Sequence, residues 1–354
     1  MAKIDALFRV ILDNGASDLH LAQGQPPKMR LHGSIHKISD EALEEERLRF
    51  LLEEICPGDR WMRFEEVGDL DFACSLGDEA RFRCNYYHHA NGNGAIFRII
   101  PRDIQTIEDL DLPPVLATFG DFANGLVLVT GPTGSGKSTT LAAIIHHVNT
   151  NYAHHILTIE EPIEFVHENK RSVIVQREVG IDAPSFGQAL LDAGHSDCDV
   201  ILVGEMRDLE TISLAITAAE SGNLVFGTLH TNSAAKTIDR LIDVFPPDQQ
   251  PQIRTMLSGS LRGVCSQLLL KRKGGGRIAA NEILLHNRAV ANIIREGSGA
   301  LNKLHSVMMG GRNVGMQLMD DVIENYRISG LISGREAYMK ALDKERFERT
   351  RDDE

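Results

Sequence analysis

The chain is poor in cysteine, with five in 354 residues, and no two of them form a C-x-x-C pair. Structural zinc sites draw their ligands from such closely spaced pairs, so the sequence predicts no structural zinc. An odd number of scattered cysteines is typical of reduced cytosolic thiols and does not suggest a disulfide framework. The five are Cys56, Cys74, Cys84, Cys198 and Cys265.

Long apolar runs are missing as well. No uncharged apolar stretch reaches the roughly 18 residues that a helix needs to span a bilayer. The opening residues 1–18 place apolar side chains at helical spacing but interrupt them with charges, which predicts an amphipathic helix and not a signal peptide. We therefore expect a soluble, cytoplasmic protein.

Basic residues are outnumbered, with 37 lysines and arginines against 50 acidic residues and a net charge of -13. The acidic excess extends over the whole chain, which argues against a protein that coats DNA or an anionic membrane. The basic segment 271–277 is better explained as an exposed hairpin tip than as a nucleic-acid site. The sequence predicts no nucleic-acid partner.

The length suggests about two domains. Residues 1–101 read as a small α+β domain with an opening helix, short alternating strands and a final strand that ends at a proline. The polar segment 102–114 is the predicted interdomain linker. In residues 115–354, short apolar runs alternate with helical segments, which is typical of an α/β domain with a parallel sheet. The expected strands are 125–130, 154–160, 172–179, 200–205 and 224–230, and a hairpin interrupts the later helices.

The most specific motif is a complete G-x-x-x-x-G-K-[ST] between an expected strand and an expected helix. Its glycines allow successive backbone N–H groups to turn towards one phosphate, and the helix start adds a positive dipole end. Lys137 reaches the outer phosphates, and Ser138 is a ligand for Mg²⁺. The predicted phosphate-binding residues are Gly131, Thr133, Gly134, Ser135, Gly136, Lys137, Ser138 and Thr139.

Charged side chains follow three of the expected strands. Glu205 ends one strand, His230 ends another, and Glu160, Glu161 and Glu164 follow a third. Ligands of parallel sheets bind at the carboxyl ends of the strands, so these side chains are expected beside the phosphate loop. The residues alone do not choose among the three glutamates, and a single histidine at a strand end is commonly structural.

These segments together resemble one family, the secretion-superfamily hexameric ATPases, and most closely the PilT-type motors that retract type IV pili. The resemblance runs almost from end to end, and it implies a RecA-like P-loop ATPase core with a smaller PAS-like α+β domain before it. The strings that carry it include ASDLHL (16–21), RFRCN (81–85), IFRIIP (96–101), TIEEPIEF, DVILVGEMRDLETI, LVFGTLHTNSAAKTIDRLIDVFPPDQQ, NIIREG and GMQLMD.

The resemblance implies a role for each candidate in the ATPase core, with ATP and Mg²⁺ as substrate and cofactor. Lys137 and Ser138 would hold phosphate and Mg²⁺, and Glu205 would support the metal and its water. Glu164 would polarise the attacking water, with Glu160 as its neighbour.

Four further residues gain roles only through the resemblance. His230 matches the histidine that senses the γ-phosphate. Arg81, Arg83 and Arg98 match arginines of the first domain that approach the nucleotide or a subunit interface. Arginines that arrive with a moving domain stabilise the transferring phosphoryl group only when the domains close.

The resemblance also implies how such a motor works. A ring of six identical subunits would convert ATP hydrolysis into rotation of the small domain about segment 102–114, at the cytoplasmic face of the inner membrane. Its partners would be the pilus platform protein and, as a further candidate, a paralogous motor. Because the chain begins at once with the small domain and has no tetracysteine site, we expect the retraction class and not the extension class.

Several positions depart from the family pattern. Leu191 and His195 stand where the family has arginines, Asn223 where it has histidine, and Ala291 where it has arginine. These changes leave open a different class, a nucleotide-binding regulatory subunit of a mixed ring with little hydrolysis of its own. An ATPase of a related secretion system is also left open, whereas the acidic balance argues against a nucleic-acid translocase.

Overall fold

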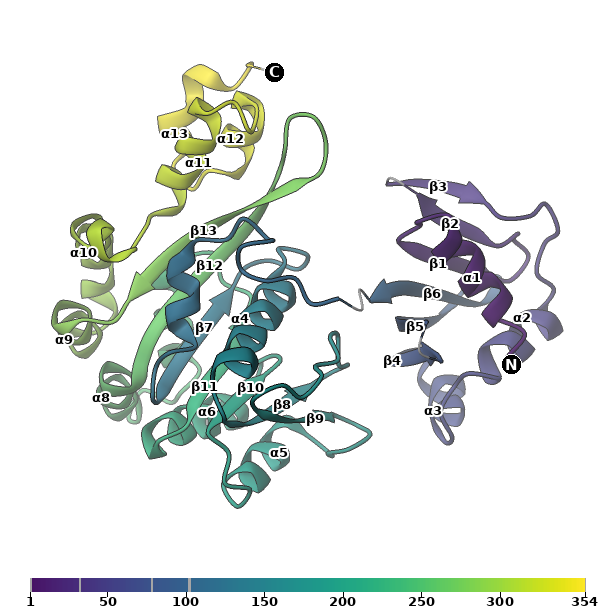
Figure 1. The fold of residues 1–354 in the computed structure, drawn as a ribbon, viewed down its shortest axis with the longest axis horizontal. Helices are drawn as coiled ribbons and strands as arrows, with labels where there is room; N and C mark the ends of the chain where they lie inside the picture. The colour runs from purple at the N-terminus through teal and green to yellow at the C-terminus, as the bar shows by residue number, and fades with distance from the viewer. Residues whose placement is uncertain (1, 32, 78, 101–102, 354) are drawn as a thin grey trace. The chain divides into compact units, whose positions relative to one another are not determined.

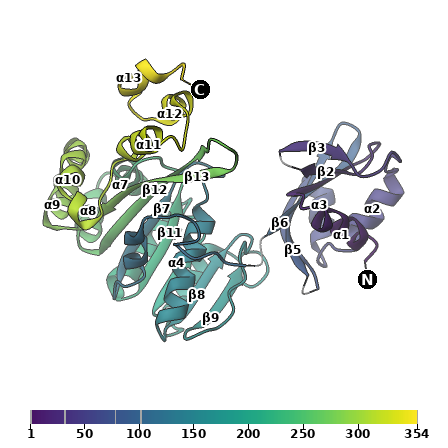
Figure 2. The same cartoon turned by 45° about the horizontal axis from the view of Figure 1, so that its top comes forward.

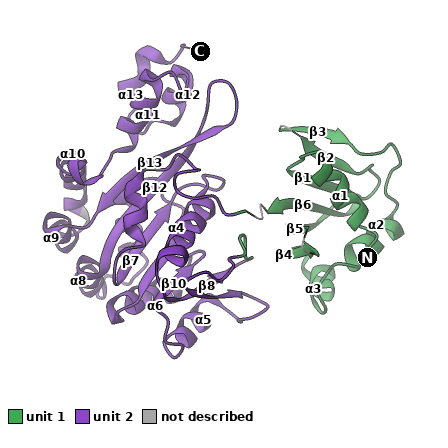
Figure 3. Cartoon of the chain, in the orientation of Figure 1, with its two compact units in different colours: residues 1–103, 162–166 green, residues 104–161, 167–354 purple. Residues whose placement is uncertain are grey.

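The computed structural model describes residues 2–31, 33–77, 79–100 and 103–353. The chain forms two compact units, residues 1–103 with 162–166 and residues 104–161 with 167–354 (Figure 3). The predicted boundary at residues 101 and 102 lies outside the described residues. Within the predicted linker, Ile107 and Leu112 are buried in the core of the second unit.

The first unit is built on an antiparallel sheet with the strand order β3-β2-β1-β6-β5-β4. Side chains alternate between the two faces of each strand, and one face is buried. Phe82 and Cys84 of β5 and Phe97 of β6 point into this core. The strands are β1 (Asp18–Ala22), β2 (Lys28–Leu31), β3 (Ser34–Lys37), β4 (Asp69–Leu76), β5 (Ala80–His89) and β6 (Gly92–Ile100).

Three helices supply the other half of this core, α1 (Asp5–Asp13), α2 (Glu45–Glu53) and α3 (Arg60–Val67) (Figure 1). On α1, Phe8 stacks on Phe82 with ring centroids 4.1 Å apart. The thiols of Cys74 and Cys84, which are ten residues apart in sequence, come within 3.3 Å of each other across β4 and β5. The first unit is thus an α+β unit with its own hydrophobic core.

The second unit is built on one sheet. In the described residues this sheet has seven strands, in the order β13-β12-β7-β11-β10-β8-β9. All neighbouring strands pair in parallel except β12 and β13, which form an antiparallel hairpin. This is the expected α/β arrangement. The strands are β7 (Gly125–Thr130), β8 (His155–Glu160), β9 (Val173–Glu178), β10 (Val200–Val203), β11 (Leu224–Leu229), β12 (Leu261–Lys271) and β13 (Arg277–Leu285).

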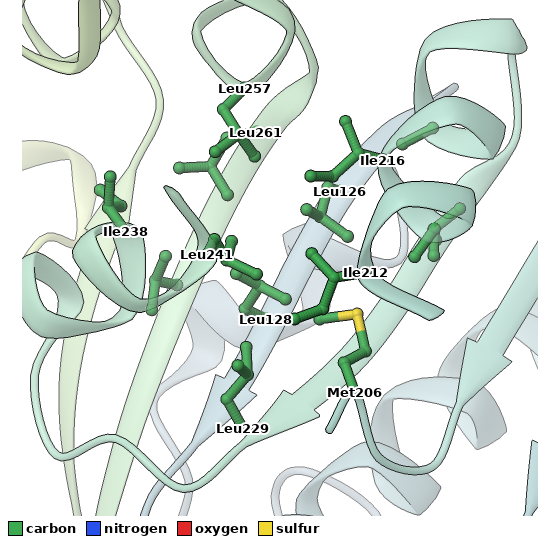
Figure 4. Packing of buried hydrophobic residues seen from close by; sticks show 14 of the residues in the cluster. Leu126, Leu128, Met206, Ile212, Ile216, Leu229, Ile238, Leu241, Leu257 and Leu261 are labelled. Carbon is green, nitrogen blue, oxygen red and sulfur yellow. The ribbon is translucent and has the colours of Figure 1, made fainter. Parts of the chain in front are cut away.

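Helices cover both faces of this sheet. One face packs against α6, α7 and α8, where Leu126 and Leu128 of β7 meet Ile212 of α6 and Leu241 of α7 (Figure 4). The other face packs against α4 (Figure 1). The helices are α4 (Lys137–Asn151), α5 (Phe186–Ala193), α6 (Leu209–Ser221), α7 (Ala234–Asp243), α8 (Gln250–Ser260), α9 (Arg288–Glu296), α10 (Leu304–Gly310), α11 (Met319–Ile328), α12 (Gly334–Lys340) and α13 (Lys344–Phe347).

The last helices, α11, α12 and α13, pack against the β12–β13 hairpin (Figure 2). Leu270 of β12 and Ile278 of β13 contribute to this cluster together with Phe347. The basic segment 271–277 forms the tip of this hairpin and is exposed, as the sequence predicted. Within the described residues, no helix is both long and apolar enough to cross a membrane.

The sequence pattern located the five expected strands from 125–130 to 224–230 to within about two residues but was less accurate in the first unit. The acidic stretch 40–54, with leucines at positions 43, 48, 51 and 52, predicts a helix over its whole length, whereas α2 begins only at Glu45. Helix α3 was missed, although Trp61 and Phe64 are buried on it at a helical spacing of three. Three and four residues are the spacings that place side chains on one helical face, so this pair was the available signal.

A buried histidine in the second unit makes stability depend on pH. Burial lowers the pKa of His167 from 6.5 to about 4, and nearby His146 acts in the same direction. The unfolded chain therefore takes up a proton at higher pH than the folded chain, so stability is full above about pH 6.5 and falls as the pH drops towards 4. Between pH 6.5 and 5 this loss is about 2 kcal/mol.

His167→Gln is accordingly expected to flatten the fall in unfolding free energy between pH 7 and pH 5. The measurement is urea unfolding at both values, with His305→Gln, at an exposed position, as the control. An unchanged pH slope in His167→Gln would contradict this assignment.

Candidate functional site

The phosphate loop connects β7, which is buried along its whole length, to the first turn of α4. Gly131, Gly134 and Gly136 have φ values of 148°, 76° and 88°, a region that favours glycine. A Cβ on Gly131 would lie 2.3 Å from the carbonyl oxygen of Gln267. The two outer glycines of the motif are thus required by backbone conformation and, at Gly131, by close contact with β12.

Lys137 begins α4 and lies over the loop. Its Nζ donates hydrogen bonds to the carbonyl oxygens of Gly131, at 2.9 Å, and Pro132, at 3.2 Å. Ser138 and Thr139 are half-buried in the same turn, Ser135 is buried, and Thr133 is exposed at the tip.

The start of α4 fits a phosphate group. The first N–H groups of a helix have no acceptor within the helix, and the N-cap Gly136 provides no capping side chain. Phosphate oxygens are the usual partners of such groups.

Glu205 and His230 meet at the carboxyl ends of the neighbouring strands β10 and β11. His230 Nε2 lies 2.8 Å from Glu205 Oε1. The parallel register that pairs Val203 with Gly227 brings both strand ends to this edge, where β7 also ends. The structure therefore brings together these two residues, which the sequence placed at one sheet edge.

Arg207 lies in the same cluster and was not among the residues predicted from the sequence. Its Nη2 donates to Glu205 Oε2 at 2.7 Å, and its Nη1 lies 3.9 Å from Glu161 Oε2. It follows Glu205 by two residues and could have been selected as a cation next to a predicted acidic site.

The electrostatics keep Glu205 ionised. The hydrogen bond from Arg207 lowers the pKa of Glu205 below its usual value, burial opposes this shift, and the charges of Arg207 and His230 act with the hydrogen bond. A group whose folded pKa is lowered keeps its charge until the pH falls through that lowered value. Glu205 is therefore a carboxylate throughout the neutral range.

The three glutamates after β8 have different surroundings. Glu160 Oε1 accepts hydrogen bonds from Thr158 Oγ1 at 2.7 Å and Gln176 Nε2 at 3.3 Å. Glu161 is exposed near Arg207. Glu164 belongs to segment 162–166, which is grouped with the first unit, so the cluster in the second unit does not include it.

In the first unit, Glu164 is an ion-pair partner of a predicted arginine. Arg83 Nη1 lies 3.1 Å from Glu164 Oε1, and Arg83 Nη2 lies 3.7 Å from Asp71 Oδ2. Both members of the first pair are about a third exposed, so the pair contributes at most about 1 kcal/mol to stability.

Arg81, Arg83 and Arg98 share the sheet face opposite the first unit's core. Arg81 and Arg83 are two residues apart on β5, and Arg83 pairs directly with Arg98 of β6. Arg98 Nε donates to the buried Asp18 at 2.9 Å. Burial alone would raise the pKa of Asp18, but hydrogen bonds from Ser17 and Arg98 outweigh it and the net shift is downward.

The positions that depart from the family pattern lie outside the Glu205 cluster. Asn223 precedes β11 and donates from its side chain to the carbonyl oxygen of Cys198, at the amino ends of the strands and so at the opposite edge from the phosphate loop. Leu191 and His195 are exposed, and Ala291 is buried in α9.

Within the part of the chain that the structure describes, no group of three or more His, Cys, Asp or Glu residues could hold a metal ion. The hydroxyl of Ser138 and the carboxylate of Glu205 are oxygen donors of the kind that Mg²⁺ takes together with substrate phosphates. The donor set therefore fits a magnesium–nucleotide and not a dedicated metal cage.

A glycine-rich loop after a buried parallel strand, with an acid and a histidine at neighbouring strand ends, defines the core of a P-loop nucleotide-binding protein. The chain matches the family described as "Type II/IV secretion system protein" over residues 2–288. The chain therefore belongs to this family.

Individual relatives are similar over nearly the whole chain. It is 49% identical over 344 residues to the "Type IV pilus retractation ATPase PilT" of Pseudomonas aeruginosa PAO1, covering 97% of this chain and 99% of that protein. The "Type IV pilus ATPase PilU" of the same strain is 34% identical, with 96% and 88% covered. A crystal structure of the pilus retraction motor PilT with bound ADP superposes with a TM-score of 0.90 at 41% identity, covering 99% of this chain and all of that one. The expected family and the expected fold with a RecA-like ATPase domain are confirmed.

Proposed function

We propose that this chain is an ATP-hydrolysing motor that drives the retraction of a type IV pilus. The observation that carries the proposal is its 49% identity to PilT over almost the full length of both chains. The lower identity of 34% to PilU favours a main retraction motor over an accessory one. The chain also retains each fixed position of the phosphate loop in a strand–loop–helix setting.

In this proposal the phosphate loop and α4 bind the triphosphate of ATP. The N–H groups of the loop and of the first helical turn hold the phosphate oxygens, and Lys137 exchanges its loop carbonyls for the outer phosphates. Ser138 and Glu205 hold Mg²⁺, Glu205 partly through water. When bound, Mg²⁺ offsets the negative charge that the transferring phosphoryl group shares with its neighbours.

The remaining site residues act on the γ-phosphate and the attacking water. Glu205 holds the ring of His230 in place, so that this histidine responds to the γ-phosphate. Glu164 polarises the attacking water, with Glu160 as its neighbour. Arg81, Arg83 and Arg98 lie on one sheet face, from which they can reach a nucleotide or a subunit interface as a group.

His230→Ala is expected to lower kcat at least tenfold while the Kd for ATP changes less than threefold, because a sensor of the γ-phosphate acts after binding. Steady-state ATPase and nucleotide titration measure the two quantities. The control is His305→Ala, which removes an exposed histidine from α10. A loss of affinity with intact turnover would contradict the sensor role.

We further propose that the first domain rotates relative to the ATPase domain, with Ile107 and Leu112 of the predicted linker moving as part of the second unit, in whose core they are buried. Six copies would form the ring, and the load would reach it through the platform protein of the pilus at the cytoplasmic face of the inner membrane. Physically, closure of the domains would convert binding and hydrolysis into rotation.

Retraction is tested directly in a bacterium whose own type IV pilus retraction ATPase gene has been deleted. Expression of this chain is expected to restore surface movement and the pulling of attached beads, whereas Lys137→Ala is not. Restoration by both proteins would show that nucleotide use by this chain is not required, and failure of both despite normal expression would contradict retraction of that pilus.

A further inference from the structure

A buried side-chain amide, that of Gln267, lies next to the phosphate loop. Gln267 lies on β12 and is 2% exposed. Its side chain makes three hydrogen bonds: Nε2 donates to the carbonyl oxygen of Ser135 at 2.7 Å, and Oε1 accepts from Thr140 Oγ1 at 2.8 Å and from Asn281 Nδ2 at 2.9 Å.

We propose that Gln267 is a positioning residue that holds the phosphate loop in its nucleotide-binding conformation, an inference that rests on the proposed function of that loop. Its bond to Ser135 fixes one peptide plane of the loop. In a trans peptide the C=O and the following N–H point in opposite directions. The contact that draws the Ser135 carbonyl towards Gln267 therefore turns the N–H of Gly136 away from Gln267, to the other side of the loop.

The loop is fitted closely around this one residue. A Cβ on Gly136 would lie 2.9 Å from Nε2 of the Gln267 side chain, and a Cβ on Gly131 would lie 2.3 Å from the backbone carbonyl oxygen of Gln267. Two of the motif's glycines are therefore needed where the loop passes Gln267. Thr140, one turn into α4, ties the helix to the same amide, so loop and helix are held by one side chain.

The neighbouring bonds fix the orientation of the amide. Because Oε1 accepts from two donors, the flipped amide would place its NH₂ group against Thr140 and Asn281 and would turn its oxygen towards the Ser135 carbonyl. In a buried site each lost partner is costly, since water cannot replace it. Asn281 itself is held by a residue further along the chain. The side chain of Gln317 donates from Nε2 to the backbone carbonyl oxygen of Asn281 at 2.7 Å.

Gln267→Glu tests the proposal, because it keeps the size of the side chain and both acceptor bonds but exchanges the donor for a titratable oxygen. When the introduced side chain is a carboxylate, it repels the carbonyl oxygen of Ser135. When it is a neutral acid, its O–H can donate a hydrogen bond to that oxygen again. We expect the Kd for MgADP to rise at least tenfold relative to wild type at pH 8 and to move back towards wild type at pH 6. Gln252→Glu, the same change at an exposed position of α8, is the control and should follow wild type at both pH values.

A second pair of variants keeps the test independent of the buried charge. Thr140→Val removes the hydroxyl that fixes the amide with little change in volume, and Thr140→Ser restores it. We expect Thr140→Val to weaken MgADP binding by about threefold to tenfold and Thr140→Ser to bind like wild type, with unfolding midpoints and oligomeric mass recorded for every variant.

Two failures are distinguishable. If wild type and Lys137→Ala bind MgADP equally, the phosphate-loop proposal itself fails. If wild type shows Lys137-dependent binding while folded Gln267→Glu and Thr140→Val both bind like wild type at every pH, Gln267 is not a positioning residue. A weakening in Gln267→Glu that is the same at pH 6 and pH 8 would also overturn the inference.

Discussion

Replacing Glu164 by alanine is expected to trap ATP on the protein. A residue that polarises the attacking water acts mainly in the transition state, so its loss leaves binding nearly intact. We expect kcat to fall about 10²-fold to 10⁴-fold, the usual range for a general base, with the Kd for ATP within about threefold of wild type. Single-turnover hydrolysis and titration with ATP measure both.

The control for this variant is Glu168→Ala, which removes an exposed carboxylate a few residues further along the chain. Glu164→Ala also breaks the ion pair with Arg83, whose members are about a third exposed and whose effect on the free energy of unfolding is at most about 1 kcal/mol. Turnover in Glu164→Ala close to that of wild type would remove Glu164 from the role, and the assignment would pass to Glu160 or Glu161.

Lys137→Ala is expected to abolish both binding and turnover. The lysine supplies the only side-chain cation of the phosphate-loop motif, and in the structure it already bridges the carbonyls of Gly131 and Pro132. We expect the Kd for ATP to rise at least tenfold and kcat/KM to fall about 10³-fold, because the charge contributes to both the bound state and the transition state.

Lys236→Ala, which removes an exposed lysine from α7, is the matched control for the loss of one positive charge. The unfolding midpoint of Lys137→Ala should stay close to that of wild type, since Lys137 is only half-buried in the first turn of α4. Lys137→Ala that still hydrolyses ATP at the rate of wild type would contradict the phosphate-loop assignment.

The sequence predicted those parts of the molecule that depend on local pattern. The phosphate loop was recognisable because its glycines, lysine and serine are contiguous and lie between a buried strand and a helix. The contact of Glu205 with His230 also followed from pattern, because both residues end parallel strands and such ends meet at one edge of a sheet.

Parts of the site that depend on distant pairings were not predictable in this way. Gln267 is 132 residues from Ser135, and only the parallel pairing of β12 with β7 brings it under the loop. The closeness of Arg207 to Glu205 follows from the sequence, but its contact with Glu161 depends on the pairing of β10 with β8. The division between the units was also not predictable at Glu164, since it is only four positions from Glu160 and yet the two belong to different units.

The departures from the family pattern look less consequential in three dimensions than in the sequence. Asn223 lies at the amino ends of the strands, away from the Glu205 cluster, and Leu191 is exposed on α5. These placements favour a working hydrolase over a regulatory subunit that binds ATP without hydrolysing it.

The central claim, that this chain is an ATP-driven motor, is tested most directly by ATPase turnover measured on the purified full chain together with its oligomeric mass. We expect turnover by a species with the mass of a hexamer, and at least 100-fold less turnover by Lys137→Ala. Turnover of the wild type no higher than that of Lys137→Ala would contradict the motor and leave a nucleotide-binding regulatory subunit in its place.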